Sequence, residues 1–470
     1  MERIYLFNTL TREVEELKPI SPGKVGLYCC GPTVYNFQHI GNFKTFLFED
    51  ILTRTLRYAG YDVTHVMNIT DVGHLTGDND EGEDKMALAM RREKKKSEEI
   101  ADFYTTKFFE DWDKLNLKRP DIVCKATQHI AEMIELIKKI EAAGCAYQAG
   151  GNVYFDVSKF EQYGKLAKLD LEKLRAGARV DLDQHKRNAF DFALWFTKSK
   201  FENQEMTWDS PWGRGYPGWH IECSAMSMKY LGEEFDIHCG GIDHIPVHHT
   251  NEIAQSEAAV GHQCVRIWMH SEFLLLDKQK MSKSTGGFLV LNDIIERGFD
   301  PLVYRMLVLG AHYRTQLNFS WEIMENTKQT LDKLRNNVIT LRAAAKSDHS
   351  EKSDPALMAQ YESTYKEALF NDLNTPQALA VVWKMLSDQA LSPADKLTLL
   401  YNFDAVLGLN LEKWEEATVE ITPELQALLE ERQAARLAKD WAAADAARDK
   451  ILALGFKVED KADGQKLRKA

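Results

Sequence analysis

The 470-residue sequence has no long hydrophobic run and no enrichment in glycine or proline. A membrane-spanning helix needs about 18 consecutive apolar residues, and no stretch approaches that length. The first segment carries Glu2, Glu13, Glu15 and Glu16, whereas a secretory signal is apolar. The 27 glycines and 12 prolines are too few for a collagen-like or low-complexity chain. We therefore expect a folded cytoplasmic protein with no membrane partner.

Cysteine is also scarce. The seven cysteines are irregularly spaced, and an odd number cannot all pair with one another. A disulfide framework in a chain of this length would need more cysteines in a more regular pattern. We expect reduced thiols or metal ligands at positions 29, 30, 124, 145, 223, 239 and 264.

Positive charge is in deficit, with 59 Lys and Arg against 71 Asp and Glu, a net charge of −12. This balance argues against nonspecific binding of nucleic acid over the whole surface. The range 421–470 differs, because it holds ten basic and nine acidic residues. We interpret this range as part of a separate module where a polyanion can approach.

What the sequence does contain begins with alternating strand and helix patterns. Short apolar stretches at 25–30 and 61–69 flank a helical pattern at 46–58, as in a βαβ unit of a parallel sheet. A charged interruption follows, and the strand-then-helix pattern returns at 235–270. From residue 320 onward the pattern is almost wholly helical. The sequence therefore predicts an α/β core with an insertion, followed by a helical bundle.

The last predicted helical region, 423–454, is amphipathic. We expect its apolar face to be packed against a core, and we favour core packing over base stacking for Trp441. The residues of this face are Leu437, Trp441, Ala444, Ile451 and Leu452.

One candidate functional segment lies between a predicted strand and a predicted helix. It reads Pro-Thr-Val-Tyr-Asn-Phe-Gln-His-Ile-Gly-Asn over 32–42. The free amides at a helix N-terminus favour phosphate. Gly41 would let a purine lie against the backbone, and His39 and Asn42 can donate hydrogen bonds to phosphoryl oxygens. The alternative is that His39 is only a local helix cap.

A second segment, Lys-Met-Ser-Lys-Ser over 280–284, is followed by Thr-Gly-Gly. Lys280 and Lys283 can both reach a polyphosphate from such a loop and stabilise charge on a leaving pyrophosphate. The alternative is an ordinary basic surface turn.

A third set consists of dispersed metal-binding side chains, Cys30, Cys223, His248 and Glu252. His248 and Glu252 are four residues apart on a predicted helix, so they share one face. Thiolate, imidazole and carboxylate together suit tetrahedral zinc. Spacing alone leaves open that the cysteines are buried apolar residues and that the His/Glu pair is surface decoration.

The first two segments together resemble the two signature motifs of class I aminoacyl-tRNA synthetases. The whole chain resembles bacterial cysteinyl-tRNA synthetases. The matching stretches include residues 30–35, 68–71, 177–180, 218–226, 235–238, 251–256, 280–284 and 439–448.

This resemblance implies a class I Rossmann-type parallel sheet core and a division of the chain into six parts. They are the first half of the core (1–115), a connective insertion (116–204), the second half of the core (205–268), the signature-lysine loop with a stem-contact region (269–320), a helical bundle (321–412) and an anticodon-binding module (413–470).

The resemblance also implies an ATP-dependent ligase that activates L-cysteine to cysteinyl-adenylate and transfers it to the 3′ end of cysteine tRNA. Its implied catalytic residues are His39, Asn42, Lys280 and Lys283. ATP binding falls on Gly41, Gly240, Gly241, Asp243 and Lys283, with Mg²⁺ on the phosphates. The amino-acid pocket falls on Thr70, Trp219, His238 and Asp243.

One zinc ion per subunit is implied, with Cys30, Cys223, His248 and Glu252 as ligands. We hypothesise that the substrate thiolate takes a further position on this metal, which distinguishes cysteine from serine. Two positions depart from the family pattern. Asn42 stands where many members have histidine, and Cys239 stands where relatives often have glycine.

The resemblance implies a monomer that contacts both the acceptor end and the anticodon of the tRNA. One rival is a paralogous ligase that passes cysteine to an amino sugar and lacks the last module, so 415–470 discriminates. A remoter rival is an inactive tRNA-binding or zinc-binding protein.

Overall fold

The computed structural model describes residues 1–73, 85–168, 184–198, 206–276, 279–280, 288–347, 353–415, 421–461 and 464–469. The chain divides into two compact units, Met1–Glu412 and Lys413–Ala470. The first unit contains a parallel sheet, an antiparallel sheet and a helical bundle.

Five parallel strands form the central sheet of the first unit, in the order β11–β10–β3–β4–β5. Their side chains are mostly buried, as expected for strands covered on both faces. The patterns at 25–69 and 235–270 thus meet in one sheet. The edge strand β5 falls inside the range 116–204 that we assigned to the insertion. The bounds are β3 Lys24–Cys29, β4 Asp62–Ile69, β5 Ile122–Lys125, β10 Phe235–Gly241 and β11 Val265–Ser271.

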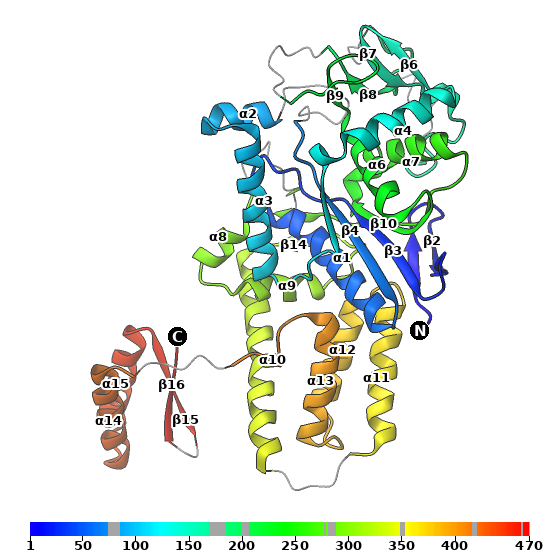
Figure 1. Ribbon diagram of the computed structural model, residues 1–470. Coiled ribbons are helices and arrows are strands. Elements are labelled where there is room, and N and C mark those ends of the chain that lie inside the picture. Colours follow the sequence, from blue (N-terminus) through cyan, green and yellow to red (C-terminus); the bar gives the residue numbers. More distant parts are fainter. Residues whose placement is uncertain are drawn as a thin grey trace. The chain divides into compact units, whose positions relative to one another are not determined.

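Helices cover both faces of this sheet (Figure 1). Helix α1 (Ile40–Tyr58) packs on one face, and α4 (Ile130–Ala142), α6 (Trp219–Leu231) and α7 (His248–Val260) pack on the other. Because adjacent residues of an extended strand point to opposite faces, Cys29 joins the cluster of α1 and Cys30 joins that of α6 and α7.

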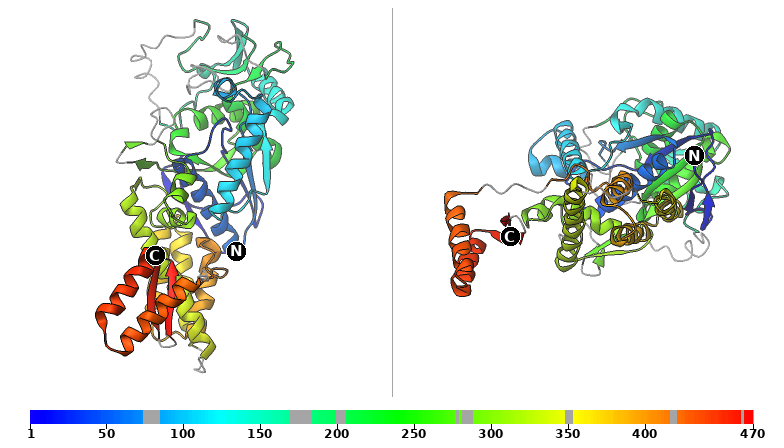
Figure 2. Two further views of the ribbon diagram at one scale, coloured as in Figure 1. Left: turned by 90° about the vertical axis from the view of Figure 1, so that its left-hand side faces the viewer. Right: turned by 90° about the horizontal axis from the view of Figure 1, so that it is seen from below.

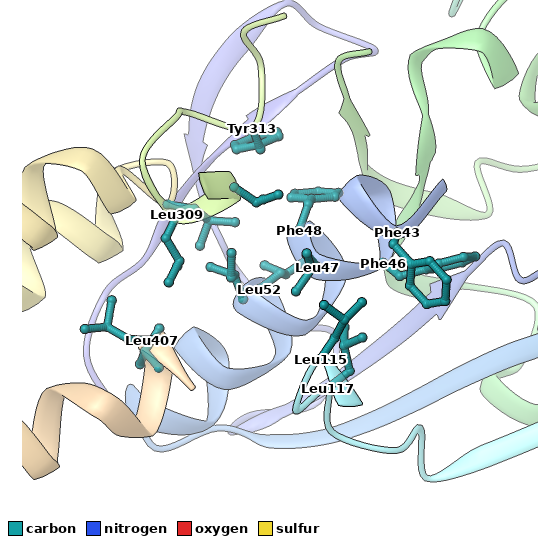
Figure 3. Close-up of a cluster of buried hydrophobic side chains, with 14 of the residues drawn as sticks. Phe43, Phe46, Leu47, Phe48, Leu52, Leu115, Leu117, Leu309, Tyr313 and Leu407 are labelled. Atoms are coloured by element: carbon teal, nitrogen blue, oxygen red, sulfur yellow. The ribbon is translucent and has the colours of Figure 1, made fainter. Parts of the chain in front are cut away.

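Helix α1 begins six residues earlier than the hydrophobic pattern predicted, at Ile40. Its buried side chains meet three segments that are distant in sequence, which joins the sheet to the helices that follow (Figure 3). The ring of Phe48 stacks on Tyr313 at a centroid separation of 4.5 Å. The core residues labelled in the close-up are Phe43, Phe46, Leu47, Phe48, Leu52, Leu115, Leu117, Leu309, Tyr313 and Leu407.

An antiparallel sheet of four strands, in the order β6–β7–β8–β9, occupies one end of the first unit. Its bounds are β6 Ala146–Ala149, β7 Asn152–Phe155, β8 Phe192–Phe196 and β9 Tyr216–Pro217. Smaller elements border the core: β1 Tyr5–Asn8, β2 Glu13–Glu16, α2 Lys85–Glu93, α3 Ser97–Lys114, β12 Leu274–Leu276, β13 Gln279–Lys280, α8 Leu291–Glu296, α9 Pro301–Leu309 and β14 Leu317–Phe319.

Four helices run side by side at the other end of this unit (Figure 2). They are α10 Trp321–Ser347, α11 Pro355–Phe370, α12 Thr375–Ser387 and α13 Pro393–Leu407. The last three begin alike, with Asp354, Asn374 or Ser392 capping a free amide and proline in the first turn. These local signals agree with the helical pattern that the sequence shows from residue 320 onward.

The second unit contains α14 (Pro423–Leu437), α15 (Trp441–Ala453) and the hairpin β15 (Phe456–Lys461) and β16 (Gly464–Lys469). Leu425, Leu429, Ile451 and Leu467 form its small core. The prediction that Leu437, Trp441 and Leu452 are packed in a core is wrong, because they are 80%, 61% and 47% exposed. Ala444, Ala447 and Ile451 form the buried stripe of α15, and Trp441 stands at its first residue, beyond that core.

Candidate active site and metal centre

A cleft of about 630 Å³ opens where the carboxyl ends of the parallel strands meet. The segments that follow β3, β4, β10 and β11 all contribute to its wall, which is where open α/β sheets bind ligands. Of the residues singled out in the sequence, the cleft brings together Cys30, His39, Gly41, Asn42, Thr70, Trp219, Cys223, Gly241, Asp243 and His248.

Three helices start at this cleft. His39 caps α1, Trp219 is the first residue of α6, and His248 is the first residue of α7, and all three line the cleft. A helix N-terminus carries a partial positive charge and free amide donors. The wall is therefore suited to an anionic ligand such as a polyphosphate.

The first signature segment forms a reciprocal cap at the start of α1. The backbone amide of Asn42 donates to Nδ1 of His39 at 3.0 Å, and the backbone amide of His39 donates to Oδ1 of the Asn42 side chain at 3.2 Å. Because Nδ1 accepts, the ring proton of a neutral His39 sits on Nε2. His39 therefore both caps α1 and lines the cleft, so being a helix cap does not prevent it from contacting a ligand.

Glycine is needed at three positions around the cleft. A Cβ atom on Gly41 would lie 2.9 Å from His39 Nδ1 and would displace the capping ring. On Gly241 it would lie 2.5 Å from Oδ1 of Asp243, and on Gly240 it would lie 2.7 Å from the rings of two histidines. Gly241 and Asp243 line the cleft, whereas Gly240 is buried next to them.

Four buried donors converge at the base of the cleft. One ligand atom each of Cys30, His248, His249 and Glu252 lies within 4.8 Å of the other three. His248, His249 and Glu252 come from the first turns of α7, and Cys30 follows β3. The sulfur of Cys30 lies 3.3 Å from Nε2 of His249.

Glu252 is the acidic member of this group and is 2% exposed. His238 donates to its Oε2 at 2.8 Å. Its Oε1 lies 2.9 Å from Nε2 of His248, so the carboxylate also forms a buried ion pair with His248. Burial raises the pKa of Glu252, but the charges of His238 and His248 outweigh it and hold the pKa well below the usual value.

A buried carboxylate oxygen that lies 2.9 Å from an imidazole nitrogen is placed as two ligands of one cation would be. The donor set of thiol, imidazole and carboxylate fits a divalent transition metal. The residues present therefore fit a metal ion at this place.

Cys223, from the second turn of α6, completes the set proposed from the sequence. Its thiol contacts Cys30 and His248. The hydrogen bond with Cys30 lowers the pKa of Cys223 to about 7, against burial, which raises it. Burial raises the pKa of Cys30 itself. Cys223 is thus the thiol of this pair that ionises more readily.

The neighbouring cysteines face away from this group. Cys29 and Cys239 are register partners in adjacent strands, and both belong to the cluster on the α1 face of the sheet. Their thiols hydrogen-bond to each other. The departure at Cys239 therefore places no thiol beside Cys30.

The residues expected in an amino-acid pocket divide into two groups. Thr70, Trp219 and Asp243 line the cleft. His238 lies deeper, is 1% exposed, and contacts Glu252 while its ring stacks on Trp268 at 4.5 Å. His238 thus supports the carboxylate of Glu252 from behind, and this role could not be read from its place in the sequence.

The second signature segment is only partly described. Lys280 lies in β13, paired with Leu275 of β12, and the neighbouring Leu274 lines the cleft. Lys283 lies outside the described residues.

His249 is the donor that the sequence analysis missed. Its Nδ1 contacts Nε2 of His270 at 2.7 Å, and Nδ1 of His270 contacts the Thr9 hydroxyl at 2.8 Å. The His-His doublet at 248–249 was a visible signal for it. Nothing in the local sequence marks Thr9 or His270, because the contact depends on strand β11 and the segment after β1.

A family model described as the class I tRNA synthetase (C) catalytic domain matches residues 16–329. A model of the cysteinyl-tRNA ligase anticodon binding domain matches residues 418–468. Together with the sheet and its cleft, these matches define the chain as a class I aminoacyl-tRNA synthetase.

Curated relatives specify the family further. The chain is 52% identical to "Cysteine--tRNA ligase" of Treponema denticola, covering 97% of this chain and 98% of the relative. It is 49% identical to "Cysteine--tRNA ligase 1" of Burkholderia lata, covering 98% and 96%. The chain belongs to the cysteine–tRNA ligase family.

A solved structure shares the fold. It is methionyl-tRNA synthetase of Mycobacterium tuberculosis in complex with methionyl-adenylate, with a TM-score of 0.59 and 17% identity. The match covers 82% of this chain and 90% of that chain. Within the described part of the chain, no helix is long and apolar enough to cross a membrane.

Proposed function

We propose that this protein activates L-cysteine with ATP and transfers it to the 3′ end of cysteine tRNA, in keeping with relatives that are named cysteine–tRNA ligases. The observation that carries the proposal is the buried group of thiol, imidazole and carboxylate donors at the base of the cleft that His39 and three helix N-termini border. The donor group at the base of the cleft can hold a metal that binds a thiol, and the helix N-termini can bind phosphate. One cleft can therefore take cysteine and ATP together.

For the metal we propose zinc, held by Cys30, Cys223, His248 and Glu252. When bound, zinc would supply a soft Lewis acid that favours the thiolate of cysteine over the hydroxyl of serine. His238 holds Oε2 of Glu252, and Oε1 faces the imidazole of His248. Such outer contacts orient metal ligands and tune their affinity.

His249 competes with Cys223 for the fourth place. Both ring nitrogens of His249 already have partners, Cys30 and His270, and burial lowers its pKa well below the usual value. Cys223 ionises more readily than Cys30, and a thiolate is the form that binds metal. We therefore assign His249 to orienting Cys30. Zinc content should fall in Cys223→Ser and persist in His249→Gln, and the reverse result would exchange the two roles.

For adenylate formation we propose that the substrate carboxylate attacks the α-phosphate of ATP in line. His39, through Nε2–H, and the amides at the start of α1 would stabilise phosphoryl oxygens, while Gly41, Gly240, Gly241 and Asp243 would cradle the adenosine. Lys280 and Lys283 would stabilise the leaving pyrophosphate, and Mg²⁺ would accompany the phosphates. Positioning and charge stabilisation supply most of the rate in such a reaction.

Asn42 has a different task from the one its motif position suggests. Its side chain and backbone are both engaged with His39 in the cap. We propose that Asn42 acts by fixing the His39 ring and the free amides of α1, and the loss of a protonatable ring at this position is therefore tolerated.

The amino-acid pocket would comprise Thr70, Trp219 and Asp243, with His238 as support behind Glu252. The ribose hydroxyl at the tRNA 3′ end would then attack the adenylate.

For tRNA we propose that 413–470 contacts the anticodon stem-loop. Unpaired bases are commonly read by stacking on aromatic rings. Trp441 is 61% exposed, and Leu437 beside the same turn is 80% exposed. This exposure favours base stacking over the core packing that we expected. The match over 418–468 also argues against the amino-sugar paralogue, which lacks this module.

We further propose that the protein acts in the cytoplasm as a monomer with one zinc ion, because Cys30, Cys223, His248 and Glu252 can supply a complete donor set within one subunit. Size-exclusion chromatography with light scattering tests this. A dimer at assay concentration would contradict it.

The deciding experiment is cysteine-dependent exchange of pyrophosphate into ATP, followed by aminoacylation of cysteine tRNA. We expect exchange with cysteine, far less with serine, and loss of exchange after removal of metal by a chelator. Cys223→Ser should abolish the cysteine-dependent signal, whereas Cys264→Ser, at a buried cysteine that follows the end of α7, serves as the matched control. Equal activity with serine, or full activity without metal, would refute the thiolate model.

A further inference from the structure

A chain of three hydrogen bonds runs along the cleft wall from the segment beside Cys30 to helix α6. The Gly31 amide donates to Oδ1 of Asn68 at 2.8 Å, and Nδ2 of Asn68 donates to the Thr70 hydroxyl oxygen at 3.0 Å. The Thr70 hydroxyl in turn donates to Oε2 of Glu222 at 3.1 Å. Glu222 is 0% exposed.

These three hydrogen bonds determine whether the Thr70 hydroxyl can donate to a ligand or only accept from it. A threonine hydroxyl has one proton and two lone pairs. Its proton is directed to Glu222, and one lone pair receives Asn68. Because Thr70 lines the cleft, the remaining lone pair offers a ligand an acceptor only.

The position of Thr70 is also rigid. Its amide donates to the Pro32 carbonyl at 3.1 Å, and its carbonyl accepts from the Val34 amide at 3.2 Å. A Cβ atom on Gly31 would lie 1.7 Å from the Asn68 carbonyl, so the two segments are in direct backbone contact. Thr70 is therefore held at a constant distance from the segment that contains Cys30.

A second buried carboxyl group, that of Asp71, lies near Glu222. Burial raises the pKa of the Asp71 carboxyl, hydrogen bonds from Thr127 lower it, and the charge of Glu222 raises it further. A buried carboxylate is stabilised by a cationic group that binds nearby. An acceptor oxygen backed by a carboxylate suits a donor that carries positive charge, such as an ammonium group.

We propose that Glu222 is a positioning residue for the α-ammonium group of the substrate, acting through the Thr70 hydroxyl. This inference rests on the proposed activation of cysteine. In cysteine the sulfur and the amino nitrogen are on adjacent carbons, so a thiol bound beside Cys30 brings the ammonium group to the neighbouring wall. The cleft then selects a thiol that carries an ammonium group, and the thiol and the ammonium group are recognised by separate residues.

The test uses the full-length protein and two thiol probes that divide the substrate. 3-Mercaptopropionate has the thiol and the carboxylate but no ammonium group, and cysteamine has the thiol and the ammonium group but no carboxylate. Both are measured as inhibitors of cysteine-dependent pyrophosphate exchange. In Glu222→Gln we expect the KM for cysteine and the Ki of cysteamine to rise by about tenfold to a hundredfold. The Ki of 3-mercaptopropionate, the KM for ATP and the zinc content should not change.

Asp71→Asn is the matched control, because Asp71 is a buried carboxylate of the same region that contacts Thr127 instead of Thr70. Its effect on the KM for cysteine should be clearly smaller. Thr70→Val should reproduce the Glu222→Gln pattern, which gives a second test if the first variant does not fold.

Three results would overturn the inference. The first is an equal rise in the Ki of both thiol probes in Glu222→Gln, which indicates damage to the thiol site. The second is an unchanged Ki for both probes. The third is a rise in the KM for cysteine in Asp71→Asn equal to that in Glu222→Gln. Absence of any cysteine-dependent exchange in the unaltered protein would instead refute the proposed function, so the two failures are distinguishable.

Discussion

Arg305 offers the sharpest prediction on how the catalytic sheet and the helical bundle are held together. The residue is 0% exposed and lies in α9. Its guanidinium donates to Oδ2 of Asp50 in α1 at 2.6 Å, to the Leu407 carbonyl at 2.6 Å and to the Leu115 carbonyl at 3.1 Å. The Arg305 side chain thus connects α9 and the segments around Leu115 and Leu407 to α1, the helix that His39 caps.

Arg305→Met retains the length of the side chain and removes every donor. The Asp50 carboxylate keeps Arg54 at 2.7 Å but loses its other buried cation. Two buried carbonyls lose a charged donor as well. An unsatisfied buried group costs about 1–3 kcal/mol, and breaking a buried ion pair from one side costs about 3–5 kcal/mol. Because these losses overlap, we expect the free energy of unfolding to fall by about 3–5 kcal/mol.

Urea denaturation followed by tryptophan fluorescence measures this change. The matched control is Arg57→Met, which removes a partly exposed ion pair of the same helix, between Arg57 and Asp121 at 2.8 Å. Such pairs contribute about 0–1 kcal/mol. If Arg305→Met and Arg57→Met lower the stability equally, the buried network does not hold the two parts together as we infer.

Three further predictions concern the site, the pH dependence and the tRNA. Gly41→Ala should lower the exchange rate at least about tenfold because the new Cβ displaces the His39 ring, whereas Gly26→Ala, with only ordinary contacts, should not; equal rates would contradict the cap. Burial lowers the pKa of His65 from 6.5 to about 4, so the unfolded chain binds a proton that the folded chain does not, and stability falls as the pH drops from 6.5 to 4. His65→Gln should flatten that slope in denaturation midpoints, and an unchanged slope would refute the assignment. Trp441→Ala should raise the KM for tRNA by about tenfold or more without affecting exchange, and Trp441→Phe should restore it; a loss of exchange would refute the separate role of this module.

Local sequence patterns predicted much of the fold because they act over a few residues. Caps and prolines mark the starts of α11, α12 and α13, and strand-helix alternation marks the parallel sheet. The alternation of side chains along a strand is also enough to place Cys29 and Cys30 on opposite faces of the sheet. For the candidate site, the cleft gathers most of the residues that the motifs and the family resemblance named.

The sequence by itself determined the element types, the two signature segments and the family, because propensity, periodicity and motif spacing are properties of neighbouring residues. Only the tertiary structure decided that Trp441 is exposed, that His249 joins the metal-binding donors, that His238 lies behind Glu252 and that Glu222 backs Thr70. Each of these depends on which distant segments meet. Burial, hydrogen-bond direction and charge are relations between such segments, and no local pattern contains them.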